Sequence, residues 1–373
     1  MRLSRTLTLY VLKEVILYAT LGGVAVTFLF LGGNAPRYTG DLFAIGFGTP
    51  DVAALCRLLG GIVATYVVPI AFLFGVLLTM GRMAADREVL AVAVCGFGRR
   101  SILFPVLSLG LLVALLTAYL VNEVEYRARM EMRGLVKSLA TRGTTPEAGK
   151  FLTLRQRVVY VEKVLPENLL ERVMISDRSD PERPMLILAE SGRFGYDDET
   201  NDFVFHLESG EVHVEEKLGS DAYQRLSFGT LDYSFDVSAM FNVGSRHLRP
   251  YDMSNARIRE ILAGAEAGQS LQPYAKKEPL YYHLELERRR ALPVAPILFA
   301  LVGVPLGVRV RRGSRSWGAL LCGLLALVYY VVLSFGRQMA EREIVSPTLA
   351  MWAPNAFFAV ISIVLLTRRE TME

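Results

Sequence analysis

Long apolar runs divide the chain into stretches of nearly the right length to cross a membrane. A helix needs about 20 mostly apolar residues to span the hydrocarbon core of a bilayer. The pattern predicts six such helices, at residues 11–33, 52–80, 102–121, 292–308, 317–335 and 349–367. The fourth is the shortest and contains Pro293, Pro296 and Pro305, so we expect it to be kinked or broken.

The long polar segment at 123–290 has a different pattern. It begins with a charged helical extension of the third span, and short stretches rich in β-branched and aromatic residues follow. They are FLTLRQRVVYVEKV, ERVMISD, PMLILAE, DFVFHLESGEVHVEE and AYQRLSFGTLDYSFDV. Regularly spaced strands of this kind are typical of a sandwich, a jelly-roll or an open barrel. We expect Ser209 and Gly210, in the fourth stretch, to form a hairpin turn.

Helical periodicity returns before the fourth span. SNARIREILAGAE places Ile258, Ile261 and Leu262 on one face, which predicts a short amphipathic helix. A second helix begins near Pro279 and leads into the fourth span. The predicted fold is therefore a membrane α-helical protein with an all-β domain inserted between membrane helices 3 and 4, and the predicted domains are 1–122, 123–290 and 291–373.

Basic residues gather in the loops on one side of the predicted membrane. They precede the first span, separate the second from the third and the fourth from the fifth, and follow the sixth. They are Arg2, Arg5, Arg82, Arg87, Arg99, Arg100, Arg309, Arg311, Arg312, Arg315, Arg368 and Arg369. Because short cytoplasmic loops carry an excess of Lys and Arg, we expect both termini in the cytoplasm and the β domain on the opposite side.

Composition and motifs exclude several kinds of chemistry. The net charge of +4 is too small to indicate a nucleic-acid partner, and the three cysteines form no CxxC pair. No P-loop motif and no metal-binding histidine spacing occur, so we expect no bound metal or cofactor. The interiors of the predicted spans lack ionisable residues, which ion-coupled transporters place near mid-membrane. If the protein transports a substrate, a partner must supply the energy.

The charged segment GRMAADREVLAVAVCGFGRR, at 81–100, lies between the second and third spans. We expect a helix at 84–95, about 18 Å long and too short to cross the bilayer. Gly96 suits the left-handed position just past a helix end, and Asp86 and Glu88 suit the first turn.

Leu90, Ala91 and Val94 form an apolar stripe along this short helix. Two interpretations stay open for it. The helix either rests on lipid headgroups or fits a groove on a cytoplasmic partner.

The chain resembles the lipopolysaccharide-export permease family, of the LptF/LptG type, over nearly its whole length. The resemblance is carried by SRTLTLYVLKEVILYATLGGVAVTFLFL, VVPIAFLFGVLLTMGRMAADREVLAVAVCGFGRRSILFPV, LELERRRALPVAPILFALVGVPLGVRVRRGSRSWG and SPTLAMWAPNAFF. The second and third blocks, in this order around a β-rich insert, are the specific ones. Gly98 departs from the Ser or Thr that is common in the family after the Cys-Gly pair.

The resemblance implies a bacterial inner-membrane protein that is a transporter subunit without its own ATPase. It implies a heterodimer with a paralogous permease subunit, bound to a cytoplasmic ATPase dimer that uses ATP. Such a complex extracts lipopolysaccharide from the outer leaflet and passes it to periplasmic jellyroll bridge proteins, here through a β-jellyroll-like domain. The ILAESGRF stretch and the general spacing favour the LptF type over the LptG type.

The resemblance also implies roles for individual residues. The segment at 82–98 corresponds to the coupling helix that inserts into the ATPase. Glu88 aligns with the family's acidic residue and is expected to contact a basic residue of the ATPase, with Asp86, Arg87 and Leu90 as secondary candidates.

Lipid phosphates would bind Arg at the periplasmic ends of the spans. Arg37 is the leading candidate because the family places basic residues there, and Arg57 and Arg337 lie at similar depth. Alternatively, these side chains only reach towards the interface or pair with nearby carboxylates such as Glu341.

Two other functions stay open. One is a subunit of a different ATP-driven machine, such as a lipoprotein extractor, which the six predicted spans disfavour. The other is a receptor or scaffold whose β domain binds a ligand and whose short helix recruits a partner. A scaffold has no reason to change the activity of an ATPase.

Overall fold

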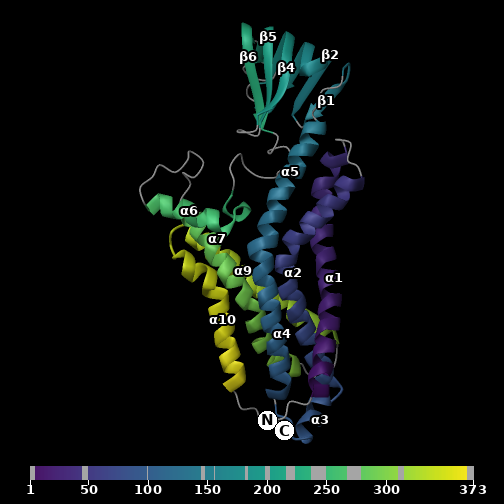
Figure 1. The fold of residues 1–373 in the computed structure, drawn as a ribbon, viewed down its shortest axis with the longest axis vertical. Helices are drawn as coiled ribbons and strands as arrows, with labels where there is room; N and C mark the ends of the chain where they lie inside the picture. Colours follow the sequence, from purple (N-terminus) through teal and green to yellow (C-terminus); the bar gives the residue numbers. More distant parts are fainter. Residues whose placement is uncertain are drawn as a thin grey trace. The chain divides into compact units, whose positions relative to one another are not determined.

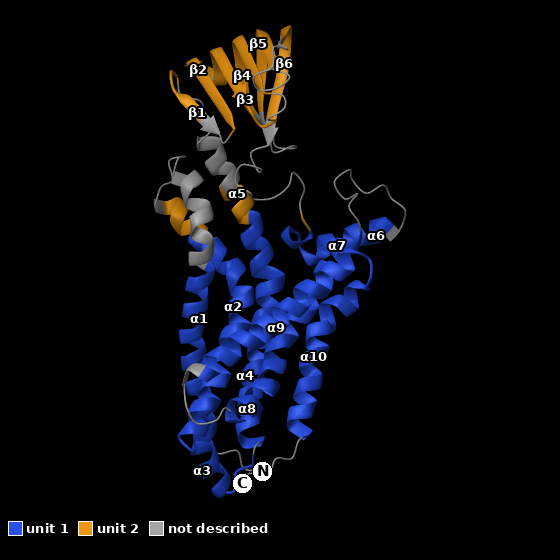
Figure 2. Ribbon diagram, turned by 180° about the vertical axis from the view of Figure 1, so that it is seen from behind, with its two compact units in different colours: residues 1–35, 56–130, 250–373 blue, residues 36–55, 131–249 orange. Residues whose placement is uncertain are grey.

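The structure is a computed structural model. It describes residues 5–43, 49–98, 100–143, 148–154, 156–180, 184–197, 202–215, 223–236, 249–266, 279–309 and 315–367. Two compact units divide the chain: unit 1 comprises 1–35, 56–130 and 250–373, and unit 2 comprises 36–55 and 131–249 (Figure 2).

Six helices among the described residues are long and apolar enough to cross a membrane, which confirms the six predicted spans. The first three are α1 (Arg5–Phe43), α2 (Thr49–Ala85) and α4 (Arg100–Tyr119), and α4 continues through a π turn (Leu120–Val124) into α5 (Glu125–Gly143). The fifth and sixth are α9 (Arg315–Glu341) and α10 (Pro347–Thr367). The start of α1, the end of α10 and the short helix α3 (Glu88–Val94) lie at the same end of unit 1 (Figure 1).

The fourth span is broken, as its prolines predict. Helix α7 (Pro279–Ala291) ends in a 3-10 turn (Leu292–Val294), and α8 (Ala295–Arg309) follows. Pro293 in this turn and Pro296 at the start of α8 have no backbone N–H to donate to the preceding turn. The amphipathic helix predicted upstream is α6 (Asn255–Glu266), which follows a 3-10 turn (Pro250–Asp252). Its residues Ile258 and Leu262 are buried against α7, as their spacing predicts.

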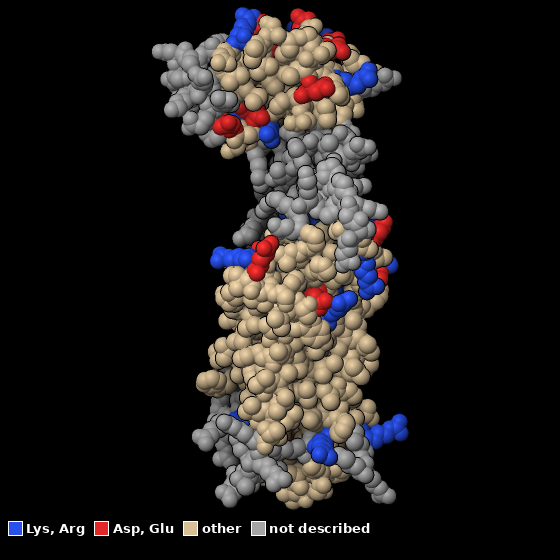
Figure 3. Space-filling model, turned by 90° about the vertical axis from the view of Figure 1, so that its left-hand side faces the viewer, with Lys and Arg blue, Asp and Glu red and all other residues tan. Residues whose placement is uncertain are grey.

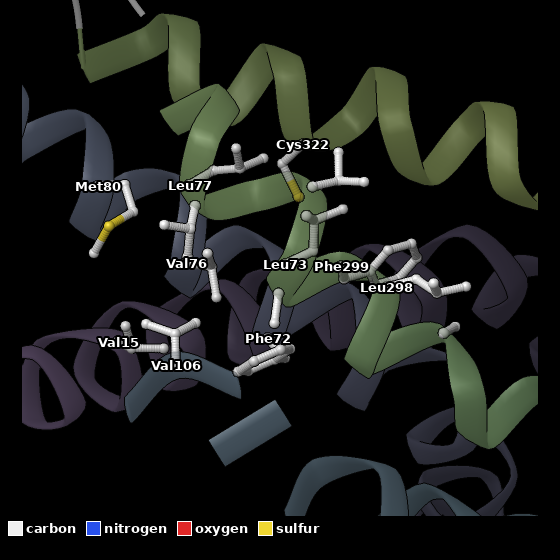
Figure 4. Close-up of a cluster of buried hydrophobic side chains, with 14 of the residues drawn as sticks. Val15, Phe72, Leu73, Val76, Leu77, Met80, Val106, Leu298, Phe299 and Cys322 are labelled. Carbon is white, nitrogen blue, oxygen red and sulfur yellow. The ribbon is translucent and has the colours of Figure 1, made fainter. Parts of the chain in front are cut away.

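The core of unit 1 forms around α2. Phe72, Leu73 and Val76 are almost fully buried and pack between Val106 of α4 and Phe299 of α8 (Figure 4). Helices α1 and α2 approach closely at Gly75, where an added Cβ would lie 2.4 Å from the carbonyl oxygen of Val15. On the face shown in Figure 3, the charged side chains of unit 1 lie near its two ends and leave a belt without charge between them. This belt suits the hydrocarbon core of a bilayer.

Unit 2 contains a six-stranded antiparallel sheet. Its strands are β1 (Phe151–Leu154), β2 (Arg157–Leu165), β3 (Leu169–Asp177), β4 (Met185–Asp197), β5 (Asp202–Glu215) and β6 (Tyr223–Asp236). Each strand pairs with its neighbour in sequence, in the order β1-β2-β3-β4-β5-β6. The sheet confirms the β domain predicted between the third and fourth spans. Phe205 is in its core, with only 1% of its surface exposed.

The hairpin turn predicted at Ser209 and Gly210 is wrong. Strand β5 continues through both residues, and its register with β4 and β6 is the same on either side of them. A Cβ on Gly210 would lie 2.5 Å from the ring of Phe228 on β6 and 2.2 Å from the carbonyl oxygen of Leu188 on β4. The glycine therefore provides space inside a strand, which a turn signal in sequence does not distinguish from a reversal.

Asp177 ties together strands that are not neighbours. Its Oδ2 accepts hydrogen bonds from Arg157 Nε of β2 at 2.9 Å and from the Tyr233 hydroxyl of β6 at 2.6 Å. Three strand spacings separate β3 from β6, or about 14 Å in a flat sheet. The sheet must therefore curl towards this face. The curl encloses apolar side chains such as Val161, Ile175 and Phe205.

The carboxylate of Asp177 is expected to make the stability of this sheet depend on pH. Burial raises its pKa, but hydrogen bonds from Ser179, Tyr233 and Arg157 outweigh burial and lower the pKa to about 2. The unfolded chain titrates near pH 3.9. The stabilisation is therefore complete above about pH 5 and is lost as the pH falls through 4 towards 2. Hydrogen exchange of β3 and β6 in the full chain, corrected for intrinsic rates, measures this loss of protection.

Asp177→Asn should lower the protection at neutral pH and remove its dependence on pH between 4 and 2. Asp180→Asn changes an exposed residue of the same turn and is the matched control. Equal pH profiles for wild type and Asp177→Asn would contradict the assignment.

Candidate functional site

The short helix between the second and third spans differs in its start from the helix predicted at 84–95. Helix α2 runs to Ala85, and its last turn closes with a hydrogen bond from Arg87 N to Ala84 O. Arg87 then has a left-handed backbone, with φ of 57°, so α3 can begin only at Glu88. Glu88 is in the first turn of α3 as expected, whereas Asp86 precedes it. Gly96 has φ of 81°, which confirms the left-handed position predicted past the helix end.

Arg82, in the last turn of α2, is the centre of an ionic cluster that holds α3. Its Nε lies 2.8 Å from Glu14 Oε2 of α1. Its Nη1 lies 3.0 Å from Glu88 Oε1 and 3.1 Å from Asp86 Oδ2. The hydroxyl of Tyr10 on α1 donates to the Glu88 carboxylate at 2.9 Å and also contacts the Arg82 guanidinium. We call Tyr10, Glu14, Arg82, Asp86 and Glu88 the Arg82 cluster.

The Arg82 cluster fixes the position of α3 relative to α1 and α2. The Arg82 side chain is only 18% exposed and the Glu88 side chain 30%, so water screens their interaction less than at an open surface. The sequence singled out Glu88 and Asp86 but not Tyr10, Glu14 and Arg82. Tyr10 and Glu14 are four residues apart and share one face of α1, which is the only signal that pointed to them.

Helix α3 presents an apolar face to the outside. Leu90 is 52% exposed and Val94 80% exposed, and Ala91 between them is exposed as well. On the opposite face, Val89 and Val92 pack against the core of unit 1. The predicted stripe is therefore the outward face of a helix that is fixed on its other side, and the exposed Arg87 lies at its start.

The three arginines predicted to bind lipid phosphates are placed differently. Arg37 lies outside the residues whose side chains the structure describes. Arg57 is exposed on α2. Arg337 is exposed on α9, and its Nε lies 2.8 Å from Glu341 Oε1. Pairing with a nearby carboxylate is the alternative to phosphate binding that the sequence left open for Arg337.

An apolar groove of about 670 Å³ lies between α1, α2 and α4. Gly23 and Thr27 of α1, Val68 of α2, and Leu109 and Val113 of α4 are among its lining residues. Its walls carry almost no polar atoms. Such a surface suits hydrocarbon chains rather than headgroups.

A second ionic cluster was missed by the sequence analysis. Glu125, Glu285, Arg288 and Arg289 are all buried in unit 1, with 1%, 5%, 7% and 3% of their surfaces exposed. They lie in the polar helical segments that continue the third span and precede the fourth. Burying charge is costly unless the charges are paired, so such a cluster marks a position with a specific role.

Comparison with known proteins gives a consistent result. The model of the family described as "Lipopolysaccharide export system permease LptF/LptG" matches residues 9–368. The chain is similar to the lipopolysaccharide export system permease protein LptF of Escherichia coli (strain K12), with 22% identity over 333 residues. That alignment covers 87% of this chain and 81% of the relative. The LptF protein of Shigella flexneri matches with the same identity and coverage.

Proposed function

The chain belongs to the LptF/LptG family of lipopolysaccharide export permeases. We propose that it is the LptF-type subunit of an ATP-driven complex that extracts lipopolysaccharide from the inner membrane. Family membership makes it a multi-pass inner-membrane protein and a transporter subunit that is not itself an ATPase. The similarity to LptF proteins supports the choice of the LptF over the LptG type.

The proposed partners follow from this assignment. They are a paralogous permease subunit in a heterodimer, a cytoplasmic ATPase dimer that binds and hydrolyses ATP, and periplasmic jellyroll bridge proteins. We place both termini and α3 in the cytoplasm and the β sheet in the periplasm. The basic residues that flank α3, including Arg82, Arg87 and Arg100, support this orientation.

The single observation that carries the proposal is the geometry of α3. Its apolar outer face, with Leu90 and Val94 exposed, suits insertion into a groove on the ATPase. Its inner face and the Arg82 cluster attach it to α1 and α2. Movement of the ATPase would therefore reach the membrane helices directly. Co-purification of an ATPase whose activity this chain changes separates this function from a receptor or scaffold.

In the proposed cycle, the apolar groove between α1, α2 and α4 holds acyl chains of the lipid, and arginines near the periplasmic surface bind its phosphates. The groove is lined by small and apolar side chains such as Gly23 and Val113, which leaves room for hydrocarbon. Guanidinium groups bind phosphate through paired, charge-assisted hydrogen bonds.

Arg37→Glu is expected to reduce photocrosslinking of lipopolysaccharide to the reconstituted complex by about tenfold, because it replaces an attractive charge by a repulsive one. Arg337→Glu should cause a smaller loss, since Glu341 already neutralises Arg337. Complex assembly, measured by co-purification of the partner subunits, should not change. Wild-type crosslinking by an assembled Arg37→Glu complex would remove Arg37 from the lipid site.

A further inference from the structure

The β sheet is connected to the membrane helices by two chain segments. The incoming segment runs from α4 through the π turn at Leu120–Val124 into α5. The outgoing segment follows the last strand and becomes described again at residue 249, just before the 3-10 turn Pro250–Asp252. Within unit 1, both segments contact α7, and α7 leads directly into the broken fourth span.

Arg288 of α7 holds the incoming segment. Its Nη2 donates to Glu125 Oε2, at the start of α5, over 3.1 Å. The same guanidinium donates to both oxygens of Glu285 on α7 at 2.8 and 2.9 Å, and to the Tyr66 hydroxyl of α2 at 3.0 Å. Glu125 also accepts from Arg129 at 2.8 Å. Buried charges therefore attach the incoming segment to α7, and Arg288 also attaches α7 to α2 through Tyr66.

Arg289, the next residue, holds the outgoing segment. Its Nη1 donates to Asn255 Oδ1 at 2.7 Å, and its Nη2 lies 2.9 Å from the carbonyl oxygen of Met253 and 3.3 Å from that of Pro250. Its Nε donates to Glu285 Oε1 at 2.7 Å. Its Nη2 also lies 3.4 Å from the carbonyl oxygen of Tyr251, so one guanidinium satisfies four acceptors in a segment of six residues, 250–255. The other two arginines of α7 are bound elsewhere: Arg288 to Glu125, Glu285 and Tyr66, and Arg290 to Glu287.

The two segments are also joined to each other. Asn255 Nδ2 donates to Asn122 Oδ1 over 2.6 Å, and Asn122 lies inside the π turn. A π turn is rare and often occurs at functional sites, and here it carries the side chain that meets the outgoing segment. Arg129 of the incoming segment lies over the ring of Tyr251 in the outgoing segment, 4.7 Å from its centroid.

We propose that six residues form a clamp that transmits movement of α7 and α8 to the two segments carrying the β sheet. They are Glu125, Glu285, Arg288, Arg289, Asn122 and Asn255. The clamp thereby couples ATP-driven movement of the membrane helices to transfer of lipid to the β domain. This inference rests on the proposed function. The clamp residues position the segments and do not bind the lipid. The pairing must persist through the cycle, since opening it would leave buried charges without partners.

The variant Arg289→Lys tests the clamp without removing its charge. A lysine still pairs with Glu285, but a single ammonium group cannot also reach Asn255 and the carbonyl groups of 250–253. We expect transfer of lipopolysaccharide per ATP hydrolysed, in the reconstituted complex, to fall about fivefold. The basal ATPase rate and complex assembly should stay at wild-type levels. Arg290→Lys changes the next residue, whose exposed side chain pairs with Glu287, and is the matched control that should change neither quantity.

A second variant keeps the inference falsifiable if Arg289→Lys is poorly folded. Asn122→Cys with Asn255→Cys should form a disulfide that joins the two segments. The two substitutions remove the hydrogen bonds from Asn255 to Asn122 and from Arg289 to Asn255, and the disulfide joins the segments again, so the oxidised protein should transfer at least as much lipid per ATP as the reduced protein. A block of transfer on oxidation that is reversed by reductant would overturn the proposal, as would wild-type transfer per ATP by folded Arg289→Lys. If the wild-type complex shows no ATP-dependent transfer, the proposed function itself fails. This result differs from the two that would overturn only the clamp, because both of those require an active wild-type complex.

Discussion

Glu88→Arg is expected to lower the release of lipopolysaccharide per ATP hydrolysed by about 30-fold or more. The change places two cations together, because residue 88 lies 3.0 Å from the Arg82 guanidinium. It also presents a positive charge to the basic residue of the ATPase that we expect Glu88 to contact. Loss of a partly buried charge pair at an interface costs about 2 kcal/mol or more, which corresponds to this factor. ATP hydrolysis and lipid release are measured together in liposomes.

Two further variants define the cause of that loss. Glu260→Arg makes the same reversal on an exposed residue of α6, and it should leave coupling unchanged. The variant Arg82→Glu, Glu88→Arg restores the internal ion pair with opposite sign, and Glu14→Gln with Asp86→Asn in the same chain avoids new repulsions at residue 82. We expect no recovery in this fourfold variant, because the ATPase still meets a positive charge at 88. Recovery would show that Glu88 acts only within this chain through Arg82.

Arg288→Met is expected to lower the stability of unit 1 strongly. It removes the cation between Glu125 and Glu285, whose surfaces are only 1% and 5% exposed. Each carboxylate then keeps one partner, Arg129 for Glu125 and Arg289 for Glu285, but loses its pair with Arg288. Removing one member of a buried ion pair typically costs about 3–5 kcal/mol, and we expect a loss near the lower end, about 3 kcal/mol. The measurement is the midpoint of thermal unfolding of the full chain in detergent.

Arg290→Met provides the comparison for this effect. Arg290 is 56% exposed and pairs with Glu287 at 2.7 Å. Glu287 is 14% exposed and also accepts from Trp352 Nε1 at 3.0 Å, so it keeps a partner without Arg290, and we expect a loss of about 1 kcal/mol or less. Its midpoint should therefore stay close to that of the wild type. Equal midpoints for Arg288→Met and Arg290→Met would show that the buried cluster does not hold α5 and α7 together.

The elements of the fold could largely be predicted from the sequence. Apolar run length is a local property, so it located all six spans, and the prolines of the fourth span located its break. Strand composition located the β domain for the same reason. The hairpin turn predicted at Ser209 and Gly210 was wrong because Gly210 makes room for Phe228 of the next strand, a contact that the local sequence does not show. Likewise, the start of α3 depends on the backbone conformation of Arg87, which residue type does not determine.

The two ionic clusters could be predicted only in part. Glu285 and Arg289 are four residues apart, so their pairing along α7 was readable from LELERRR. Glu125, by contrast, is 163 residues from Arg288, and Tyr10 is 72 residues from Arg82. These contacts exist only because the helices pack in this arrangement. A single sequence therefore identifies the charged segments but not their partners.

The central claim is that this chain is a permease subunit whose α3 couples an ATPase to lipid extraction. The most direct test is ATP-dependent release of lipopolysaccharide from liposomes containing this chain, its paralogous subunit and the ATPase, with an acceptor bridge protein outside. We predict release that requires all three components and ATP, and an ATPase rate that changes when this chain is present. An ATPase that neither binds this chain nor responds to it, with no release of lipid, would contradict the account.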